Sequence, residues 1–117
     1  MQFEVTHLDN KIKQVKLIGR LDLKGTNEID DAFSFAVGSS KAPTLIDMSE
    51  VEFIASIGMQ MLISNTRSLA RRSSKLVLLN PTPLVREALV TAGFESLIPM
   101  YDDFDTACAD LQTALVE

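Results

Sequence analysis

The chain has 117 residues, 46% of them hydrophobic, a size and composition that favour one globular domain spanning residues 1–117. Its net charge of −5 argues against nucleic-acid binding, which needs a basic face, and no apolar run approaches the roughly 20 residues of a membrane-spanning helix. The single cysteine, Cys108, excludes an internal disulfide, and no secretion signal is visible, so we expect a cytoplasmic protein.

The first half of the chain predicts two strands, a helix and a third strand. Residues 2–7 alternate polar and apolar side chains and predict a strand with one buried face, and residues 12–18 predict its hairpin partner. A helix capped by Thr26 or Asn27 should follow and end near Gly38. Residues 44–48 are short and apolar, which predicts a buried strand that ends in a polar turn.

The second half of the chain predicts three more helices and two more strands. Apolar residues recur at helical spacing from Met59 to Ala70, and residues 75–79 predict another buried strand. Thr82 should cap a helix that starts at Pro83, turns Leu84 inward and stops at Gly93. Residues 97–100 are the candidate for a last short strand, and Asp102 or Asp103 should cap the final helix.

The order β-β-α-β-α-β-α-β-α predicts an α/β fold. Strands that alternate with helices form parallel sheets through right-handed crossovers, whereas a hairpin is antiparallel. We therefore expect a mixed, mainly parallel central sheet in which the opening hairpin is the antiparallel part.

Few residues in the chain offer catalytic or metal-binding chemistry. The one histidine, His7, lies in an alternating strand, which favours a structural or surface role over that of a general base. No G-x-S-x-G, dinucleotide or phosphate-loop motif is present, and one cysteine with one histidine cannot form a zinc site. The basic residues Arg67, Arg71, Arg72 and Lys75 suit the solvated end of a helix. We expect no catalytic residue, no cofactor and no metal.

A serine surrounded by apolar residues marks the start of a predicted helix. Ser56 falls at the expected N-cap, where its hydroxyl would accept a backbone N–H and add about 1 kcal/mol of stability. A phosphate on that hydroxyl would meet free N–H groups and the positive end of the helix dipole. The same phosphate would add about −1.5 to −2 charges in front of a partner docked on the apolar residues. Ser56 is therefore predicted to switch protein binding off.

These residues resemble the STAS domain family, and within it the bacterial anti-sigma factor antagonists. The family pattern is roughly D-L-S-x-V-x-F-(I/M)-D-S-(S/T)-G-L, and it is matched in register by Asp47-Met48-Ser49, Val51, Phe53-Ile54, Ser56, Gly58 and Met59. Upstream, the stretch from Leu17 to Asp22 is similar to L-x-G-E-L-D, with Arg20 in place of the glutamate. Downstream, the stretch from Pro83 to Phe94 is similar to P-x-V-x-x-x-L-x-x-x-G-(L/F).

The resemblance implies a STAS domain over the whole chain that acts as an anti-sigma factor antagonist without being an enzyme. In this role Ser56 matches the serine that a cognate anti-sigma factor, itself a serine kinase, phosphorylates, and a PP2C-type phosphatase removes the phosphate. The unphosphorylated form binds the anti-sigma factor and frees the sigma factor. Asp22 matches an acidic residue of partner recognition. The other expected contact residues come from the serine motif: Ile54, Ala55, Ile57, Gly58 and Met59.

Two positions depart from the family pattern and keep a second function open. Ala55 stands where many members have aspartate, and Ile57 stands where serine or threonine is common, so Ser56 is the sole hydroxyl at that point of the motif. The missing carboxylate at Ala55 suits a constitutive STAS adaptor in a sensory or transporter complex, in which Ser56 only caps its helix. An enzyme is disfavoured, because no catalytic group besides Ser56 can be named.

Overall fold

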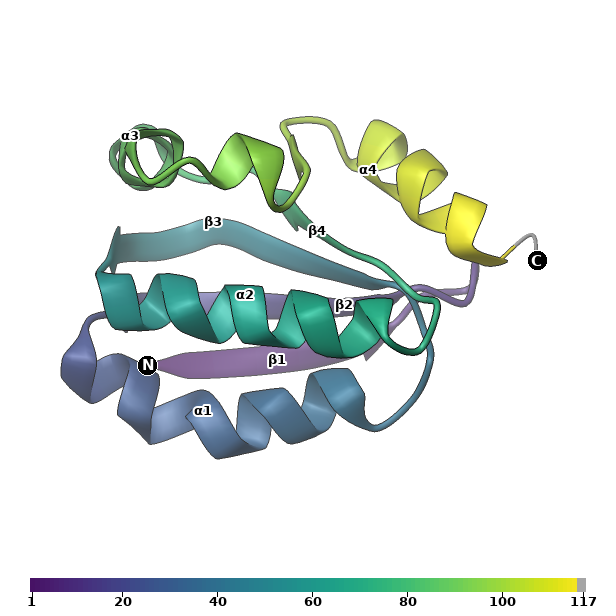
Figure 1. The fold of residues 1–117 in the computed structure, drawn as a ribbon, viewed down its shortest axis with the longest axis horizontal. Coiled ribbons are helices and arrows are strands. Elements are labelled where there is room, and N and C mark those ends of the chain that lie inside the picture. The colour runs from purple at the N-terminus through teal and green to yellow at the C-terminus, as the bar shows by residue number, and fades with distance from the viewer. Residues whose placement is uncertain (116–117) are drawn as a thin grey trace.

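A computed structural model, which describes residues 1–115, shows a five-stranded sheet between two layers of helices (Figure 1). The strands lie in the order of the chain, β1 (Gln2–His7), β2 (Lys13–Leu21), β3 (Thr44–Ile54), β4 (Leu76–Leu79) and β5 (Met100–Tyr101). Strand β1 is antiparallel to β2, and every later pair is parallel. The α/β fold with a mixed, mainly parallel sheet is therefore confirmed.

The helices divide between the two faces of the sheet. Helices α1 (Leu23–Gly38) and α2 (Ser56–Ala70) lie side by side on one face, while α3 (Pro83–Thr91) and α4 (Phe104–Gln112) lie on the other (Figure 1). Short 3-10 turns follow α3 at Phe94–Ser96 and α4 at Thr113–Leu115. None of the helices within residues 1–115 combines the length and the apolar character that crossing a bilayer requires.

Two buried apolar clusters hold the layers together. Strand residues alternate between the faces of a sheet, so neighbouring residues enter different clusters. Ile46 and Leu78 belong to the larger cluster, which includes Phe33 of α1, while Leu45 and Val77 belong to the cluster beneath α4. Alternation along β3 and β4 thus lets one strand pair anchor helices on both sides.

Strand β1 corrects the expectation of a strand with one buried face. Its residues are exposed except for Phe3, which is half-buried and meets Phe33 of α1 edge-on with ring centroids 5.9 Å apart. Strand β1 has β2 as its single neighbour and lies at the edge of the sheet, so Val5 and His7 remain in contact with solvent. An alternating pattern does not distinguish such an edge strand from a half-buried one.

Strand β3 corrects the predicted polar turn after Met48. The strand continues through Ser49 and Glu50 to Ile54, and its register with β2 shifts twice, each time with one extra residue on β3. Such bulges bend a strand without ending it. Glu50 forms an ion pair with Lys16 of β2, which keeps both polar side chains at the surface.

The predicted ends of the helices and strands agree with the structure in part. Thr82 occupies the N-cap position of α3, but its side chain forms no capping hydrogen bond. Gly93 follows that helix in the left-handed conformation (φ 80°), and Asp103 caps α4 by accepting the Thr106 N–H. The last strand is Met100–Tyr101 instead of residues 97–100, because the chain first makes the 3-10 turn after α3. The expected caps Thr26 and Asn27 are wrong, because α1 already begins at Leu23.

Candidate functional site

Strands β2 and β3 end side by side, and a helix begins directly after each of them (Figure 1). Leu21 and Ile54 are paired in the sheet, and the Ala55 N–H donates to the Leu21 carbonyl at 2.9 Å. Asp22 and Ser56 are the residues that follow Leu21 and Ala55. Asp22 and Ser56 are 34 positions apart in the chain, and the structure brings these two predicted site residues together where the two strands end.

Two glycines allow the starts of α1 and α2 to pack closely on the end of β2. A Cβ atom on Gly25 would lie 1.9 Å from the Arg20 carbonyl oxygen, and one on Gly58 would lie 2.8 Å from the Leu21 Cβ. Both distances are shorter than real Cβ contacts, so only glycine fits without movement of the backbone or its neighbours. Gly58 is buried, which places this predicted contact residue beneath the surface. Gly25 was missed, although its spacing of three residues after Asp22 is that of a cap and its target.

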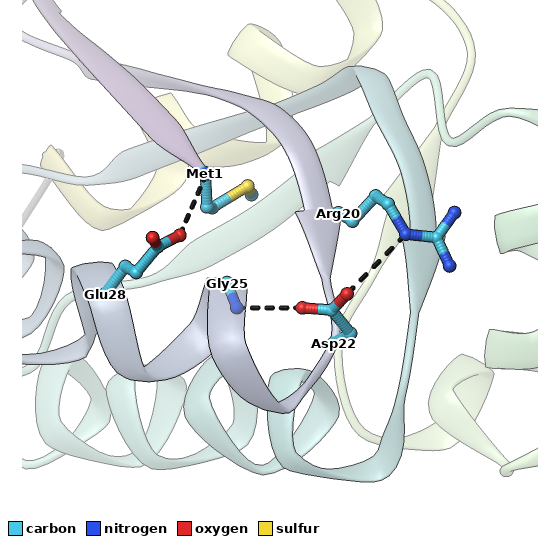
Figure 2. Close-up of polar contacts among 5 residues, drawn as sticks. All are labelled: Met1, Arg20, Asp22, Gly25 and Glu28. Carbon is cyan, nitrogen blue, oxygen red and sulfur yellow. Dashed lines mark hydrogen bonds and ion pairs between the residues drawn. The ribbon is translucent and has the colours of Figure 1, made fainter.

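Asp22 caps α1 and is held by contacts on both carboxylate oxygens (Figure 2). Its Oδ1 accepts the Gly25 N–H at 2.8 Å, and its Oδ2 lies 3.5 Å from the Arg20 Nε. The Gly25 N–H, and then Arg20, lower the pKa of Asp22 below its ordinary value, so the carboxylate is charged at neutral pH. Arg20 is held from its other side by Phe53, with the guanidinium carbon 4.6 Å from the ring centroid.

A second ion pair lies near this cap. The α-ammonium of Met1 donates to the Glu28 carboxylate of α1 at 3.2 Å, and Figure 2 shows this pair beside the Asp22–Gly25 contact. Met1 also fills the space beside Gly19, whose φ of +117° suits glycine. The start of β1, the end of β2 and the first turns of α1 are thus tied together.

Ser56 is the first residue of α2 and its side chain is exposed. The prediction that Ser56 is the N-cap is wrong by one residue, because Ala55 holds that position with extended backbone angles (φ −103°, ψ 173°). Alanine has no side-chain acceptor, so within the described residues 1–115 no side chain caps α2. An exposed hydroxyl therefore lies beside first-turn N–H groups that receive no side-chain partner.

The remaining predicted contact residues differ in how much surface they offer. Ala55, Ile57 and Met59 are half-buried and present part of their side chains to solvent. Ile54 is only 5% exposed and belongs to the main core cluster. Ile54 and Gly58 therefore support the site from below, whereas Ala55, Ile57 and Met59 contribute to its surface.

A groove of about 450 Å³ extends from Ser56 between α2 and α3. Its lining consists of Ser56, Met59, Leu84, Glu87, Ala88, Thr91 and Ala92. Leu84 was predicted to face the core, but it is 64% exposed, and Val85 and Leu89 are the buried residues of α3. The groove could not be predicted from the sequence, because no local pattern shows that residues of α2 and α3 line one surface.

The basic cluster, Arg67, Arg71, Arg72 and Lys75, lies at the opposite end of α2 from Ser56 and contacts α1 and α4. Arg72 donates to the Gly38 carbonyl at the end of α1, and the Lys75 Nζ lies 2.5 Å from the Asp110 Oδ1 of α4. Asp110 also accepts the Tyr101 hydroxyl at 2.5 Å. Arg67, Arg71 and Arg72 are exposed, as expected for the solvated end of a helix, whereas Lys75 is half-buried and paired with Asp110.

Among residues 1–115, no three or more histidine, cysteine, aspartate or glutamate side chains are gathered as a metal site.

The arrangement of the described elements is that of the SpoIIAA-like α/β fold. SpoIIAA in its unphosphorylated form matches with a TM-score of 0.77 and 20% identity over 96% of this chain and 97% of that one. The phosphorylated form of SpoIIAA from Bacillus matches with a TM-score of 0.68 and 20% identity over 93% of this chain and 98% of that one.

The sequence profile of the STAS domain matches residues 3–107, and the chain belongs to the STAS domain family. BtrV of Bordetella bronchiseptica, whose name assigns it provisionally to the anti-sigma factor antagonists, is 24% identical over 99 residues, 85% of each chain. The anti-sigma F factor antagonist of Lysinibacillus sphaericus is 24% identical over 94 residues, 80% of each chain. The family membership inferred from the three motifs is thereby confirmed.

Proposed function

We propose that this protein is an anti-sigma factor antagonist whose binding is switched off by phosphorylation of Ser56. The observation that carries the proposal is the exposed Ser56 hydroxyl at the start of an α2 helix without a side-chain cap. Two relatives bear the name of anti-sigma factor antagonist, and SpoIIAA, which shares the fold, has a phosphorylated form. The partner is an anti-sigma factor with serine-kinase activity, and a PP2C-type phosphatase reverses the modification.

In the unphosphorylated state, the anti-sigma factor contacts the edge where α1 and α2 begin. Ala55, Ile57 and Met59 offer apolar surface there, and Asp22 offers a carboxylate whose orientation is fixed by Gly25 and Arg20. A fixed carboxylate loses little side-chain entropy when it pairs with a donor of the partner. Asp22 therefore acts as a recognition residue, and the apolar surface contributes most of the affinity.

Phosphorylation adds charge without a need for refolding. The Ser56 oxygen attacks the γ-phosphorus of ATP held by the kinase, ADP leaves, and the hydroxyl proton is released. The product ester carries about −1.5 to −2 charges at neutral pH. First-turn N–H groups of α2 stabilise the anion within this chain, whereas the partner would have to bury it against an apolar surface. Hydrolysis of the ester by the phosphatase restores the hydroxyl and the binding state.

Incubation with the cognate kinase and ATP tests the assignment. Mass spectrometry should find one phosphate, on Ser56, and none on Ser56→Ala. Ser49→Ala is the matched control, because Ser49 is an exposed serine of the same motif and its loss should leave phosphorylation unchanged. If Ser56→Ala accepts phosphate as readily as the wild type, the site is wrongly assigned.

A constitutive STAS adaptor is the second candidate, and Ala55 is the observation that favours it. Replacement of the family's aspartate removes a charge that a kinase could read beside Ser56. The reason given for a purely structural Ser56 does not hold, however, because no side chain caps α2. Affinity capture with Ser56→Asp separates the two functions. Binding that is unchanged from the wild type favours the adaptor, and lost binding favours the switch.

A further inference from the structure

The α2–α3 groove begins at the residue proposed as the switch. Ser56 and Met59 form its α2 side, and Leu84 forms part of its α3 side. Leu84 follows Pro83, whose ring fixes the backbone at the first position of α3, so this exposed leucine stands on a rigid support. A large aliphatic side chain that is 64% exposed beside a groove costs hydration free energy in the free protein.

A phosphate on Ser56 can repel a partner only if the partner's surface comes close to the Ser56 side chain. That side chain lines the groove, so a partner sensitive to the phosphate approaches the groove. We infer that the anti-sigma factor inserts an apolar side chain into the α2–α3 groove, between Met59 and Leu84. This inference rests on the proposed function and names the surface through which that function operates.

The charge within the groove also specifies the partner. Glu87 is the one charged residue among those lining it, and its side chain is exposed. An apolar segment with a lysine or arginine next to it satisfies both the groove and the Glu87 carboxylate. Met59 adapts to the shape of the inserted side chain, because its unbranched thioether has several accessible rotamers. A phosphate on Ser56 would place charge at the mouth of this apolar surface, in the path of the inserting side chain.

Titration calorimetry tests the groove with the purified anti-sigma factor that phosphorylates the wild-type chain. Leu84→Ala should raise the dissociation constant roughly tenfold or more, as expected for an apolar anchor. Leu97→Ala is the matched control, since Leu97 is 50% exposed and lies outside the groove, and its dissociation constant should stay within about twofold of the wild type. Circular dichroism should show both variants folded.

A charge reversal at Glu87 tests for the partner's lysine or arginine independently of the apolar side chain that enters the groove. Glu87→Lys should weaken binding and make it less sensitive to salt, because attraction between the partner's cation and Glu87 is lost. Glu95→Lys makes the same charge change on an exposed residue outside the groove and should have a much smaller effect.

The Ser56→Asp variant distinguishes failure of the groove from failure of the proposed function. If Ser56→Asp loses binding while Leu84→Ala and Glu87→Lys bind like the wild type, the groove is not the docking surface and the switch remains. If Ser56→Asp binds like the wild type, the proposed switch fails and the groove inference falls with it. Loss of binding in Ser56→Asp, Leu84→Ala and Glu87→Lys, with both controls unchanged, supports the inference.

Discussion

Gly25 is the residue on which the geometry of the α1 start depends most directly. A Cβ atom there would lie 1.9 Å from the Arg20 carbonyl oxygen, a contact that only a shift of the α1 start relieves. We expect Gly25→Ala to lower the free energy of unfolding by about 2–4 kcal/mol, in the range of severe overpacking with loss of a cap. Chemical denaturation measures the loss.

Gly38 provides the matched control in the same helix. A Cβ atom at Gly38 would meet no atom of residues 1–115 within 4 Å, and this glycine has no positive φ. Gly38→Ala should therefore raise the free energy of unfolding by about 0.5–1 kcal/mol, since alanine restricts the unfolded chain more than glycine does. Equal effects of the two substitutions would contradict the close approach of α1 to β2.

The lowered pKa of Asp22 predicts that the free energy of unfolding depends on pH. Its pKa in the folded state is lowered below 3.8 by the Gly25 N–H and Arg20. A carboxylate with a lowered folded pKa stabilises the protein above its unfolded pKa, and this contribution is lost as the pH falls through the folded value. Asp22→Asn keeps an oxygen for the cap but lacks the charge. The stability difference between the wild type and Asp22→Asn should therefore be largest above pH 4 and should vanish in stronger acid.

A titration of carboxyl ¹³C shifts by NMR checks the same point without unfolding. The Asp22 signal should titrate below 3.8, and the Arg20→Gln variant should bring its midpoint closer to that value. A midpoint at or above 3.8 in the wild type would show that the cap and the ion pair do not form.

At the residue scale, sequence patterns proposed candidate site residues, but they did not predict how exposed each residue is. Asp22 and Ser56 were found through motifs, and the structure places both at one edge of the sheet. The exposure of Leu84 was not predicted, because Leu84, Val85 and Leu89 all suit an apolar helical stripe. Which of them faces solvent depends on where α3 sits on β3, and this is set by tertiary packing.

Lys13 links two elements, because its buried ammonium group reaches the end of α1. The residue is only 2% exposed, and its Nζ donates to the Ala36 carbonyl at 2.6 Å and to the Ser39 Oγ at 3.2 Å. Carbonyls of a last helical turn lack intrahelical partners, so a cation placed there satisfies and stabilises them. Lys13→Met should destabilise the fold by about 1–3 kcal/mol, as expected for the loss of a hydrogen bond from a charged donor. Urea denaturation measures this effect.

Lys24→Met is the control for the loss of a positive charge. Lys24 is an exposed lysine of α1 itself, and its replacement should change the unfolding free energy by less than about 0.5 kcal/mol. Similar stabilities of Lys13→Met and wild type would show that the buried contact adds nothing.

At the element scale, hydrophobic periodicity predicted the order of strands and helices. It did not predict where each strand or helix begins and ends. Ser49 and Glu50 suggested a turn, yet both lie in β3, where two bulges accommodate the extra residues. Pairing with β2 continues from Glu50 to Ile54, although β4 pairs only with Thr44–Asp47, so the strand does not end at Ser49. Likewise, α1 starts at Leu23 because Asp22 caps it, whereas the sequence pattern predicted Thr26 or Asn27 as the cap.

At the scale of the whole molecule, the candidate site and the structural contacts of the basic cluster lie at opposite ends of α2. Asp22 and Ser56 lie at the edge where β2 and β3 end, while the basic cluster lies at the far end of α2 and holds α1 and α4. The sequence could predict that parallel strands would gather helix starts at one edge. It could not predict the groove, because the lining combines residues of α2 and α3, whose relative placement is set by tertiary packing.

The separation of surfaces predicts that the switch acts on binding without unfolding the domain. Ser56→Glu places a charge at the uncapped start of α2, where an anion stabilises a helix by about 0.3–1 kcal/mol. Ser64→Glu is the matched control, because Ser64 is exposed in the middle of α2, far from the helix dipole's ends. Thermal unfolding should show Ser56→Glu at least as stable as Ser64→Glu, while only Ser56→Glu loses the anti-sigma factor in calorimetry. A Ser56→Glu variant that is clearly less stable than Ser64→Glu would mean that the charge disrupts the domain, and its loss of binding would then follow from damage to the fold.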